Sequence, residues 1–167
     1  RCLQMNEENS LNSEMNETSH KHIGFIEHGT VIDHIPNESI FKIIRILKLD
    51  YSNALVFVGF NLESERIIKK GLIKIENIVL DDETLYKIAL IAHDVTINII
   101  KNKTVVEKKR LKLPDLFFGI MKCINYNCIT NKESVQTKFI VQDKINRIFQ
   151  CYFCETKIHD NEIEIVK

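Results

Sequence analysis

Residues 123–128, Cys-Ile-Asn-Tyr-Asn-Cys, and residues 151–154, Cys-Tyr-Phe-Cys, decide the fold of the C-terminal third of this chain. The two cysteines enclose four residues in the first stretch and two in the second, and 22 residues separate the stretches. This spacing is typical of a zinc site in which two short loops each supply two thiolates. Four thiolates fill the tetrahedral shell of zinc, so a structural ion is predicted. Two disulfides or a redox-active cysteine pair are the alternative interpretations of the same spacing.

A small all-β, zinc-ribbon-like domain is predicted around these cysteines, over residues 114–167. No helical period follows Pro114, and short strands are expected over residues 135–142, 147–153 and 162–166. A domain of this size buries too little apolar surface for a strong core of its own. We therefore expect the metal to contribute much of its folding free energy.

The preceding residues, 22–113, predict an α+β domain with the element order β-α-β-β-α-β. Apolar residues recur at helical spacing after Pro36 and again after Asp81, and the segments between them alternate or run apolar as strands do. The expected extended segments are residues 22–28, 30–35, 54–60, 73–76, 95–100 and 104–111. This order is the ferredoxin-like arrangement, in which both helices cover one face of an antiparallel sheet. The continuous apolar run 54–60 predicts a strand buried on both faces.

The face of that sheet opposite the helices is expected to carry polar side chains, among them Lys74 and Asn98. Such a face can hold a polar ligand, and an ordinary solvated sheet face accounts for the same pattern. Asp33 and His34 are neighbours in a predicted strand, so their side chains should point to opposite sides and form no catalytic dyad. His93, at the end of the second helix, is expected to complement the helix dipole. The sequence contains no Gly-rich phosphate loop, metalloprotease motif or nucleophile elbow, which argues against an enzyme.

Composition excludes several classes of protein. The chain has 167 residues, 44% hydrophobic and 28% charged, which is typical of a folded protein. The 23 basic residues balance the 23 acidic ones, so the whole chain is not a polyelectrolyte. Between Lys101 and Lys122, however, seven basic residues face two acidic ones. A solvated strand, a phosphate site and a nucleic-acid face all fit this stretch, although residues 101–112 offer no aromatic ring for base stacking.

The sequence also predicts where the protein resides. Residues 1–21 are polar and without periodicity, and we expect a disordered tail there. No apolar run approaches the roughly 18 residues of a membrane span, and no secretory signal is visible. We therefore expect a cytoplasmic protein with reduced cysteines and no membrane partner.

Four strings carry a resemblance to a known family: GTVIDHIP at residues 29–36, LIKIEN at 72–77, NYNCITN at 125–131 and CYFCE at 151–155. They resemble the regulatory chains of bacterial and archaeal aspartate carbamoyltransferase, and the likeness runs in unbroken order from about Ile23 to the C-terminus. The resemblance implies a non-catalytic regulatory subunit of pyrimidine biosynthesis. Its N-terminal domain would bind CTP or ATP as allosteric effectors, and its zinc domain would dock on the catalytic chain.

The resemblance also implies particular residues and partners. The nucleotide site would comprise Ile26, Val31, Asp33, His34, Lys74, Asn98, Ile100, Val105 and Lys108. One structural Zn²⁺ per chain would be held by Cys123, Cys128, Cys151 and Cys154. Regulatory-chain homodimers would bridge two catalytic trimers, and no nucleic acid is expected as a partner. A zinc-ribbon protein that binds nucleic acid through the stretch from Lys101 to Lys122 is the alternative function.

Overall fold

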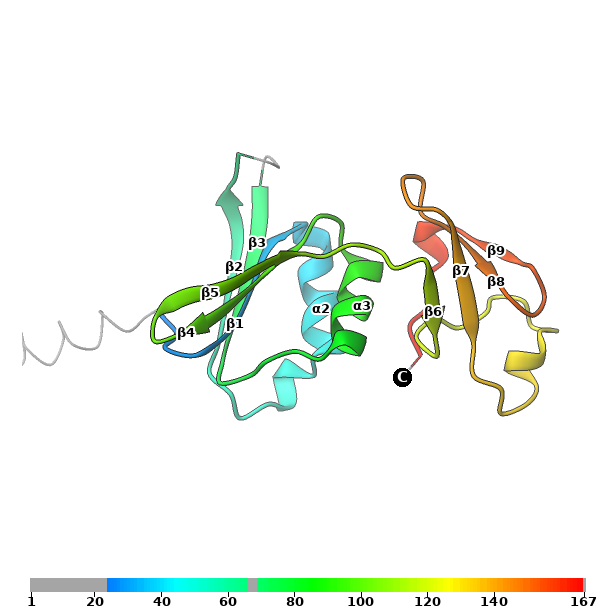
Figure 1. The fold of residues 1–167 in the computed structure, drawn as a ribbon, viewed down its shortest axis with the longest axis horizontal. Helices are drawn as coiled ribbons and strands as arrows, with labels where there is room; N and C mark the ends of the chain where they lie inside the picture. Colours follow the sequence, from blue (N-terminus) through cyan, green and yellow to red (C-terminus); the bar gives the residue numbers. More distant parts are fainter. Residues whose placement is uncertain (1–23, 66–68, 167) are drawn as a thin grey trace, which may run out of the picture.

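The computed structural model describes residues 24–65 and 69–166, and these contain two separate sheets connected by residues 111–115 (Figure 1). Residues 24–113 make the N-terminal module, a five-stranded sheet with two α-helices. Residues 114–166 make the C-terminal module, which is built on a four-stranded sheet. The predicted α+β class is therefore confirmed. The tail predicted for residues 1–21 lies outside the described residues.

The sheet of the N-terminal module is antiparallel, with the strand order β2-β3-β1-β4-β5. Its strands are β1 (Gly29–Ile35), β2 (Val56–Glu63), β3 (Lys69–Glu76), β4 (Thr96–Lys101) and β5 (Thr104–Arg110). Strands and α-helices follow one another in the predicted order, and β5 is added at the edge next to β4.

The segment that precedes β1 differs from the prediction, because residues 24–28 form no strand. Two of their carbonyl groups bond to the N–H groups of turn residues. The Glu27 carbonyl accepts from the Lys103 N–H at 3.0 Å, and the His28 carbonyl accepts from the Asn77 N–H at 3.0 Å. The segment therefore follows the turns at one end of the sheet and has no ladder of its own.

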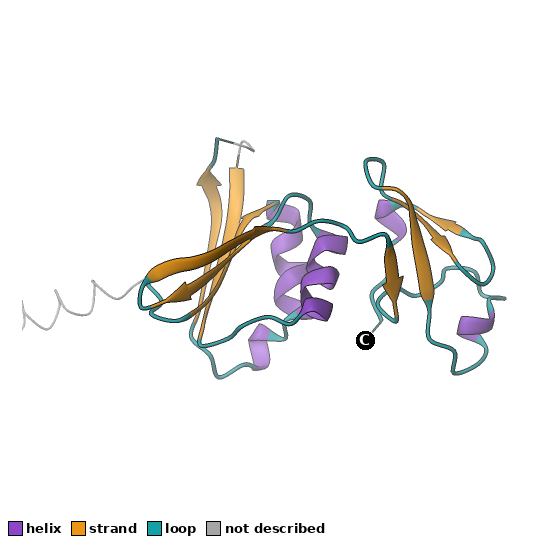
Figure 2. Cartoon of the chain, viewed as in Figure 1, coloured by secondary structure: helices purple, strands orange, loops and turns teal. Residues whose placement is uncertain are grey.

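Both α-helices, α2 (Ile40–Ile46) and α3 (Asp82–Ile91), lie on one face of this sheet (Figure 2). Pro36 leads into α2 through the 3-10 turn η1 (Asn37–Ser39), and η2 (Leu49–Tyr51) follows the helix. Asp81 begins α3 by accepting a hydrogen bond from the Thr84 N–H at 2.8 Å. That bond satisfies one of the N–H groups that a helix start leaves free. The two predicted helix starts are thus confirmed.

The main hydrophobic core lies between these helices and the sheet. It includes the strand residues Ile32, Ile73, Ile75 and Ile97 and the helix residues Ile40, Ile43, Leu85, Ile88 and Ala89. Because successive strand residues point to opposite faces, Val31, Lys74 and Asn98 point away from the helices. We call the face that carries these three side chains the open face.

The apolar run 54–60 predicted a strand buried on both faces. Strand β2, which contains most of this run, is not buried on both faces. It pairs only with β3 and forms one edge of the sheet. Val58, Phe60 and Leu62 are exposed along it. The apolar run is therefore an edge strand that exposes large hydrophobic side chains, and not a central strand.

The C-terminal module has the strand order β6-β7-β8-β9. The strands are β6 (Leu116–Phe118), β7 (Lys138–Asp143), β8 (Ile148–Cys151) and β9 (Lys157–Ile158), with 3-10 turns η3 (Ile129–Asn131) and η4 (Asp160–Glu162). The strand expected over residues 162–166 is reduced to one bridge between Met121 and Ile165. Phe117, Phe139 and Phe149 are fully buried in the core, which also contains three of the cysteines.

Candidate functional site

The four cysteines of the C-terminal module converge on one point. Their sulfur atoms all lie within 4.8 Å of one another, and three of the four residues are buried. The Sγ atoms of Cys123 and Cys154 are 3.5 Å apart, and those of Cys128 and Cys151 are 3.8 Å apart. Sulfurs bound tetrahedrally at about 2.3 Å from one zinc ion would lie about 3.8 Å apart. The cluster therefore has the dimensions of a four-thiolate metal site, and all four residues are free cysteines and not disulfides.

Short-range hydrogen bonds hold the two cysteine loops in place. The Asn131 side chain donates to the Cys123 carbonyl at 2.7 Å and to the Asn125 carbonyl at 2.8 Å, which closes the first loop. In the second loop, the Cys151 N–H donates to the Thr156 carbonyl at 3.0 Å. These bonds fix the sulfur positions from outside the cluster, as the second shell of a metal site does.

Three thiols of this cluster, those of Cys123, Cys151 and Cys154, have a shifted pKa. Burial raises the pKa of Cys123 and of Cys151. Burial also acts to raise the pKa of Cys154, but hydrogen bonds with Thr156 and with neighbouring thiols outweigh it and lower the pKa to about 6. A cation in the centre would stabilise all four thiolates and release protons as it binds. The donor set thus fits a soft metal ion. Within the described residues, it is the one cluster of three or more such ligands.

The second candidate site is the open face, where a row of side chains crosses the whole sheet. Direct cross-strand pairing joins Phe57 to Lys74, Lys74 to Val31, Val31 to Asn98 and Asn98 to Lys108. Directly paired residues point to the same side of a sheet. Five side chains from five strands therefore lie in line, with a lysine near each end and an amide between them.

An apolar cluster lies beside this row. Ile26, Val31 and Ile100 are buried together, with Phe57 and Leu72 packed against them. The structure thus brings Ile26, from the segment before β1, against the open face with two other predicted nucleotide-site residues. Val105 pairs directly with Ile100 across a β-bulge and is 53% exposed.

Asp33 and His34 lie at a β-bulge, so the prediction that they point apart is wrong. The register of β1 against β3 shifts between Ile32 and Ile35, and His34 adopts a left-handed conformation with φ of 61°. As a result, His34 Nδ1 lies 3.2 Å from Asp33 Oδ2. The bulge places both side chains next to each other at the end of the open face.

Lys70 is a site residue that the sequence reasoning missed. Its Nζ atom lies 2.8 Å from Asp33 Oδ1, and both side chains are largely buried. Lys70, Leu72 and Lys74 alternate along β3, so they share one face of the strand. The same alternation that identified Lys74 was the signal that could have found Lys70.

Lys74 already has partners on the open face. Its Nζ atom donates to the Gly24 carbonyl and lies 5.8 Å from the centre of the Phe25 ring. Lys74 is therefore directed along the open face towards the segment before β1. Together Lys70, Lys74 and Lys108 give this face three cations, and Asp33 and Glu76 each give it a carboxylate.

Comparison with known proteins identifies both modules. Residues 21–112 match the family described as aspartate carbamoyltransferase regulatory chain, allosteric domain, and residues 117–164 match the metal binding domain of the same chain. The aspartate carbamoyltransferase regulatory chain of Bacteroides thetaiotaomicron is 42% identical over 144 residues, covering 86% of this chain and 94% of the relative. The regulatory chains of Thermococcus sibiricus and Pyrococcus abyssi are each 41% identical, covering 84% of this chain and 93% and 94% of theirs.

Among the helices that the structure describes, none has the length and apolar character needed to cross a bilayer.

Proposed function

This chain belongs to the family of aspartate carbamoyltransferase regulatory chains, and from that premise we propose that it senses CTP and ATP on its open face. It is a regulatory, non-catalytic chain with an allosteric domain and a metal-binding domain, and it associates with catalytic chains. We assign the allosteric domain to residues 22–113 and the metal-binding domain to residues 114–167. The family matches to residues 21–112 and 117–164 support this division.

The observation that carries the nucleotide proposal is the row across the open face. Lys74 on β3 and Lys108 on β5 are separated by two strands, β1 and β4, which carry Val31 and Asn98. Ammonium groups are suited to phosphate, and several of them along one face can bind a triphosphate. We assign the triphosphate to the lysines of this row.

The remaining predicted residues suit the nucleoside. The Asp33 carboxylate, held by Lys70 and His34, can accept hydrogen bonds from ribose hydroxyls. Ile26, Val31 and Ile100 offer an apolar surface for the base, with Asn98 beside it to bond to its polar edge. Val105, at the exposed edge beyond Ile100, completes this contact surface.

The metal that we propose for the cysteine cluster is one structural zinc ion, bound by Cys123, Cys128, Cys151 and Cys154. The thiolate donor set and the sulfur spacing support zinc over harder cations. On this basis we describe the C-terminal module as zinc-ribbon-like and the N-terminal module as ferredoxin-like. The strand order β2-β3-β1-β4 with both helices on one face supports the second description.

Two exposed apolar surfaces are suited to contact with the proposed partners, the catalytic chain and a second regulatory chain. Around the cysteine loops, the side chains of Ile124, Tyr126, Ile129, Tyr152 and Phe153 are exposed, and we assign this surface to the catalytic chain. At the other end of the molecule, β2 presents an open sheet edge beside Phe41 and Phe60, whose ring centres are 5.3 Å apart. We assign this edge to a second regulatory chain, because pairing of two such edges would cover both.

Regulation then follows from linkage. An effector that binds the open face more tightly in one quaternary state than in the other shifts the equilibrium between the states by its ratio of affinities. The zinc domain, attached to the catalytic chain, would carry that shift to the active site. The chain itself needs no catalytic residue.

Calorimetric titration of the purified chain with CTP and with ATP tests the proposal. Lys108 and Lys109 are neighbours in β5, but Lys108 pairs with Asn98 on the open face whereas Lys109 pairs with Ile97. Lys108→Ala should weaken CTP binding by about tenfold, the loss of one charge-assisted contact of about 1.4 kcal/mol, and Lys109→Ala should have little effect. Equal effects of the two substitutions, or no CTP binding by the unmodified chain, would contradict the proposal. Binding of DNA or RNA that weakens steeply with salt would instead favour the nucleic-acid alternative.

A further inference from the structure

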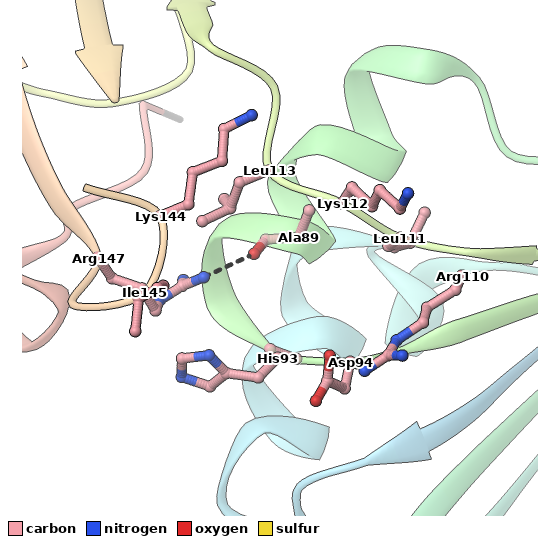
Figure 3. A pocket seen from close by; sticks show the side chains of 11 residues that line it. Ala89, His93, Asp94, Arg110, Leu111, Lys112, Leu113, Lys144, Ile145 and Arg147 are labelled. Carbon is pink, nitrogen blue, oxygen red and sulfur yellow. Dashed lines mark hydrogen bonds and ion pairs between the residues drawn. The ribbon is translucent and has the colours of Figure 1, made fainter. Parts of the chain in front are cut away.

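The C-terminal end of α3 is capped by a side chain from the other module. The helix begins with Asp81, Asp82 and Glu83, but its last turn contains no basic residue. The carbonyl groups of a last turn have no partners within the helix, and they form the negative end of its dipole. The Arg147 guanidinium supplies the partners, donating from Nη1 to the Ala89 carbonyl at 3.3 Å and from Nη2 to the Leu90 carbonyl. Figure 3 shows Arg147 reaching across to Ala89 from the C-terminal module.

Arg147 is held firmly where it makes these bonds. It is 3% exposed, and its guanidinium lies 5.9 Å from the centre of the Phe149 ring. The turn between β7 and β8 is closed by the Asp143 side chain, which accepts from the N–H groups of Ile145 at 2.8 Å and Asn146 at 2.9 Å. A left-handed backbone at Arg147, with φ of 51°, then directs the side chain towards α3. Its position is thus fixed by the C-terminal module.

Asp160 ties the same arginine to a second residue of the N-terminal module. Its Oδ1 atom accepts from Arg147 Nε, and its Oδ2 atom lies 3.5 Å from Nε2 of His93, just after α3. A buried charge needs compensation, which Asp160 and the two carbonyl groups provide. The Asp160 carboxylate therefore contacts Arg147 of the C-terminal module and His93 of the N-terminal module.

The other ion pairs around this contact stay within one module. A cavity of about 530 Å³ separates the modules here and is lined by Arg110, Lys144 and Arg147 among others. Arg110 pairs with Asp94 at 2.5 Å inside the N-terminal module, and Lys144 pairs with Asp115 at 2.6 Å inside the C-terminal module. Among the described ion pairs around this cavity, the one between His93 and Asp160 joins the two modules.

The capped helix end is connected directly to the open face. Residues 92–95 lead from α3 into β4, which carries Asn98 and Ile100. The side chain of Leu90 is buried in the core of the C-terminal module, whereas its neighbour Ala89 belongs to the core of the N-terminal module. A shift of β4 would therefore move the end of α3, where Arg147 bonds the two modules to each other.

We propose that Arg147 is the coupling residue of this regulatory chain, transmitting the effector state of the open face through the end of α3 to the metal-binding domain. This inference rests on the proposed function, because it concerns how that function is transmitted. Coupling between two sites needs an element that both sites bias. The end of α3 is such an element, since β4 holds it from one module and Arg147 and Asp160 hold it from the other.

The test uses the assembled complex of this chain with its catalytic chains and compares Arg147→Met with Lys144→Met. Lys144 lines the same cavity, but its ion pair does not cross between modules. In the Arg147→Met complex, CTP affinity should stay within about twofold of the unmodified complex, while the change of activity caused by saturating CTP or ATP should fall by about fivefold or more. Zinc content and assembly should be retained. Lys144→Met should respond to nucleotides as the unmodified complex does, and Arg147→Lys, which keeps a cation at the helix end, should restore part of the response.

The outcomes separate the coupling role from the effector site. Absence of nucleotide binding in the unmodified chain overturns the proposed function, and with it the coupling. A full nucleotide response in the Arg147→Met complex overturns the coupling role alone. If Arg147→Met does not assemble, Asp160→Asn decides, because that side chain is 45% exposed and contributes little to the core. An unchanged nucleotide response in the Asp160→Asn complex would then refute the proposal.

Discussion

Removal of the metal should unfold the C-terminal module while the N-terminal module stays folded. Three of the four cysteine residues are buried, and their sulfurs belong to the same core as Phe117, Phe139 and Phe149. Without the ion, that core keeps its aromatic contacts but loses the link between the two cysteine loops.

The magnitude follows from the size of the module. Globular proteins are stable by roughly 0.05–0.15 kcal/mol per residue, so a module of about 50 residues is stable by about 3–8 kcal/mol in total. Zinc binding to a structural site of this kind contributes about 10 kcal/mol or more at neutral pH. The contribution of the metal thus exceeds the whole expected stability of the module. The metal-free module should be unfolded, and not merely loosened.

The assay follows zinc release and structure together. A mercurial reagent displaces zinc from thiolates, and a colorimetric chelator counts the ion as it leaves. Circular dichroism and limited proteolysis then report which residues remain folded, and calorimetry reports whether CTP still binds. Protease cleavage after residue 114 with CTP binding retained is the expected result. Unchanged dichroism and protease resistance after complete zinc loss would refute the reasoning, because the core would then be sufficient without the metal.

Three further predictions concern single residues. Hydrogen bonds from Thr84 hold the pKa of Asp81 below its ordinary value of 3.8, so Asp81→Ala should cost about 1 kcal/mol at pH 7 in urea unfolding. Because that pKa is lower in the folded state, the difference from the unmodified chain should shrink as the pH falls below about 4, and a constant difference would contradict the assignment. Gly29→Ala should destabilise the chain by about 2 kcal/mol or more, since φ is +135° and an added Cβ would lie 2.1 Å from the Ile75 carbonyl oxygen; unaltered thermal unfolding would count against this. If the proposed regulatory-chain dimer forms through the β2 edge, Phe60→Glu should convert it to monomers in sedimentation, whereas Val106→Glu, on the opposite edge strand, should not.

Local patterns predicted much of this fold. The helix starts at Pro36 and Asp81, the alternation along β3 and the spacing of the cysteine pairs are all short-range signals. They depend on helix caps, on the alternation of strand residues and on the reach of a short loop. The structure accordingly confirms the helices, the strand order along the chain and the convergence of four sulfurs on one point.

The wrong predictions share a different cause, which is that strand neighbours and bulges are not local properties. The run 54–60 is apolar like a central strand, but its place in the sheet depends on which strands pair with it, and it lies at an edge. The alternation rule places Asp33 and His34 on opposite faces unless a bulge intervenes, and the bulge here is set by the register against β3. No count of residue types within β1 could reveal it.

The end of α3 is another case in which local sequence could not predict a contact between residues far apart in the chain. The sequence suggested that His93 complements the dipole of this helix, because His93 is the nearest basic residue along the chain. The structure gives that role to Arg147, which follows Ala89 by 58 residues and belongs to the other module, and it pairs His93 with Asp160 instead. The boundary that we propose near Pro114 does not divide the packing, since Leu90 of α3 is buried in the core of the C-terminal module. The two modules therefore share a helix end, so a change of position in one module has to be accommodated by the other.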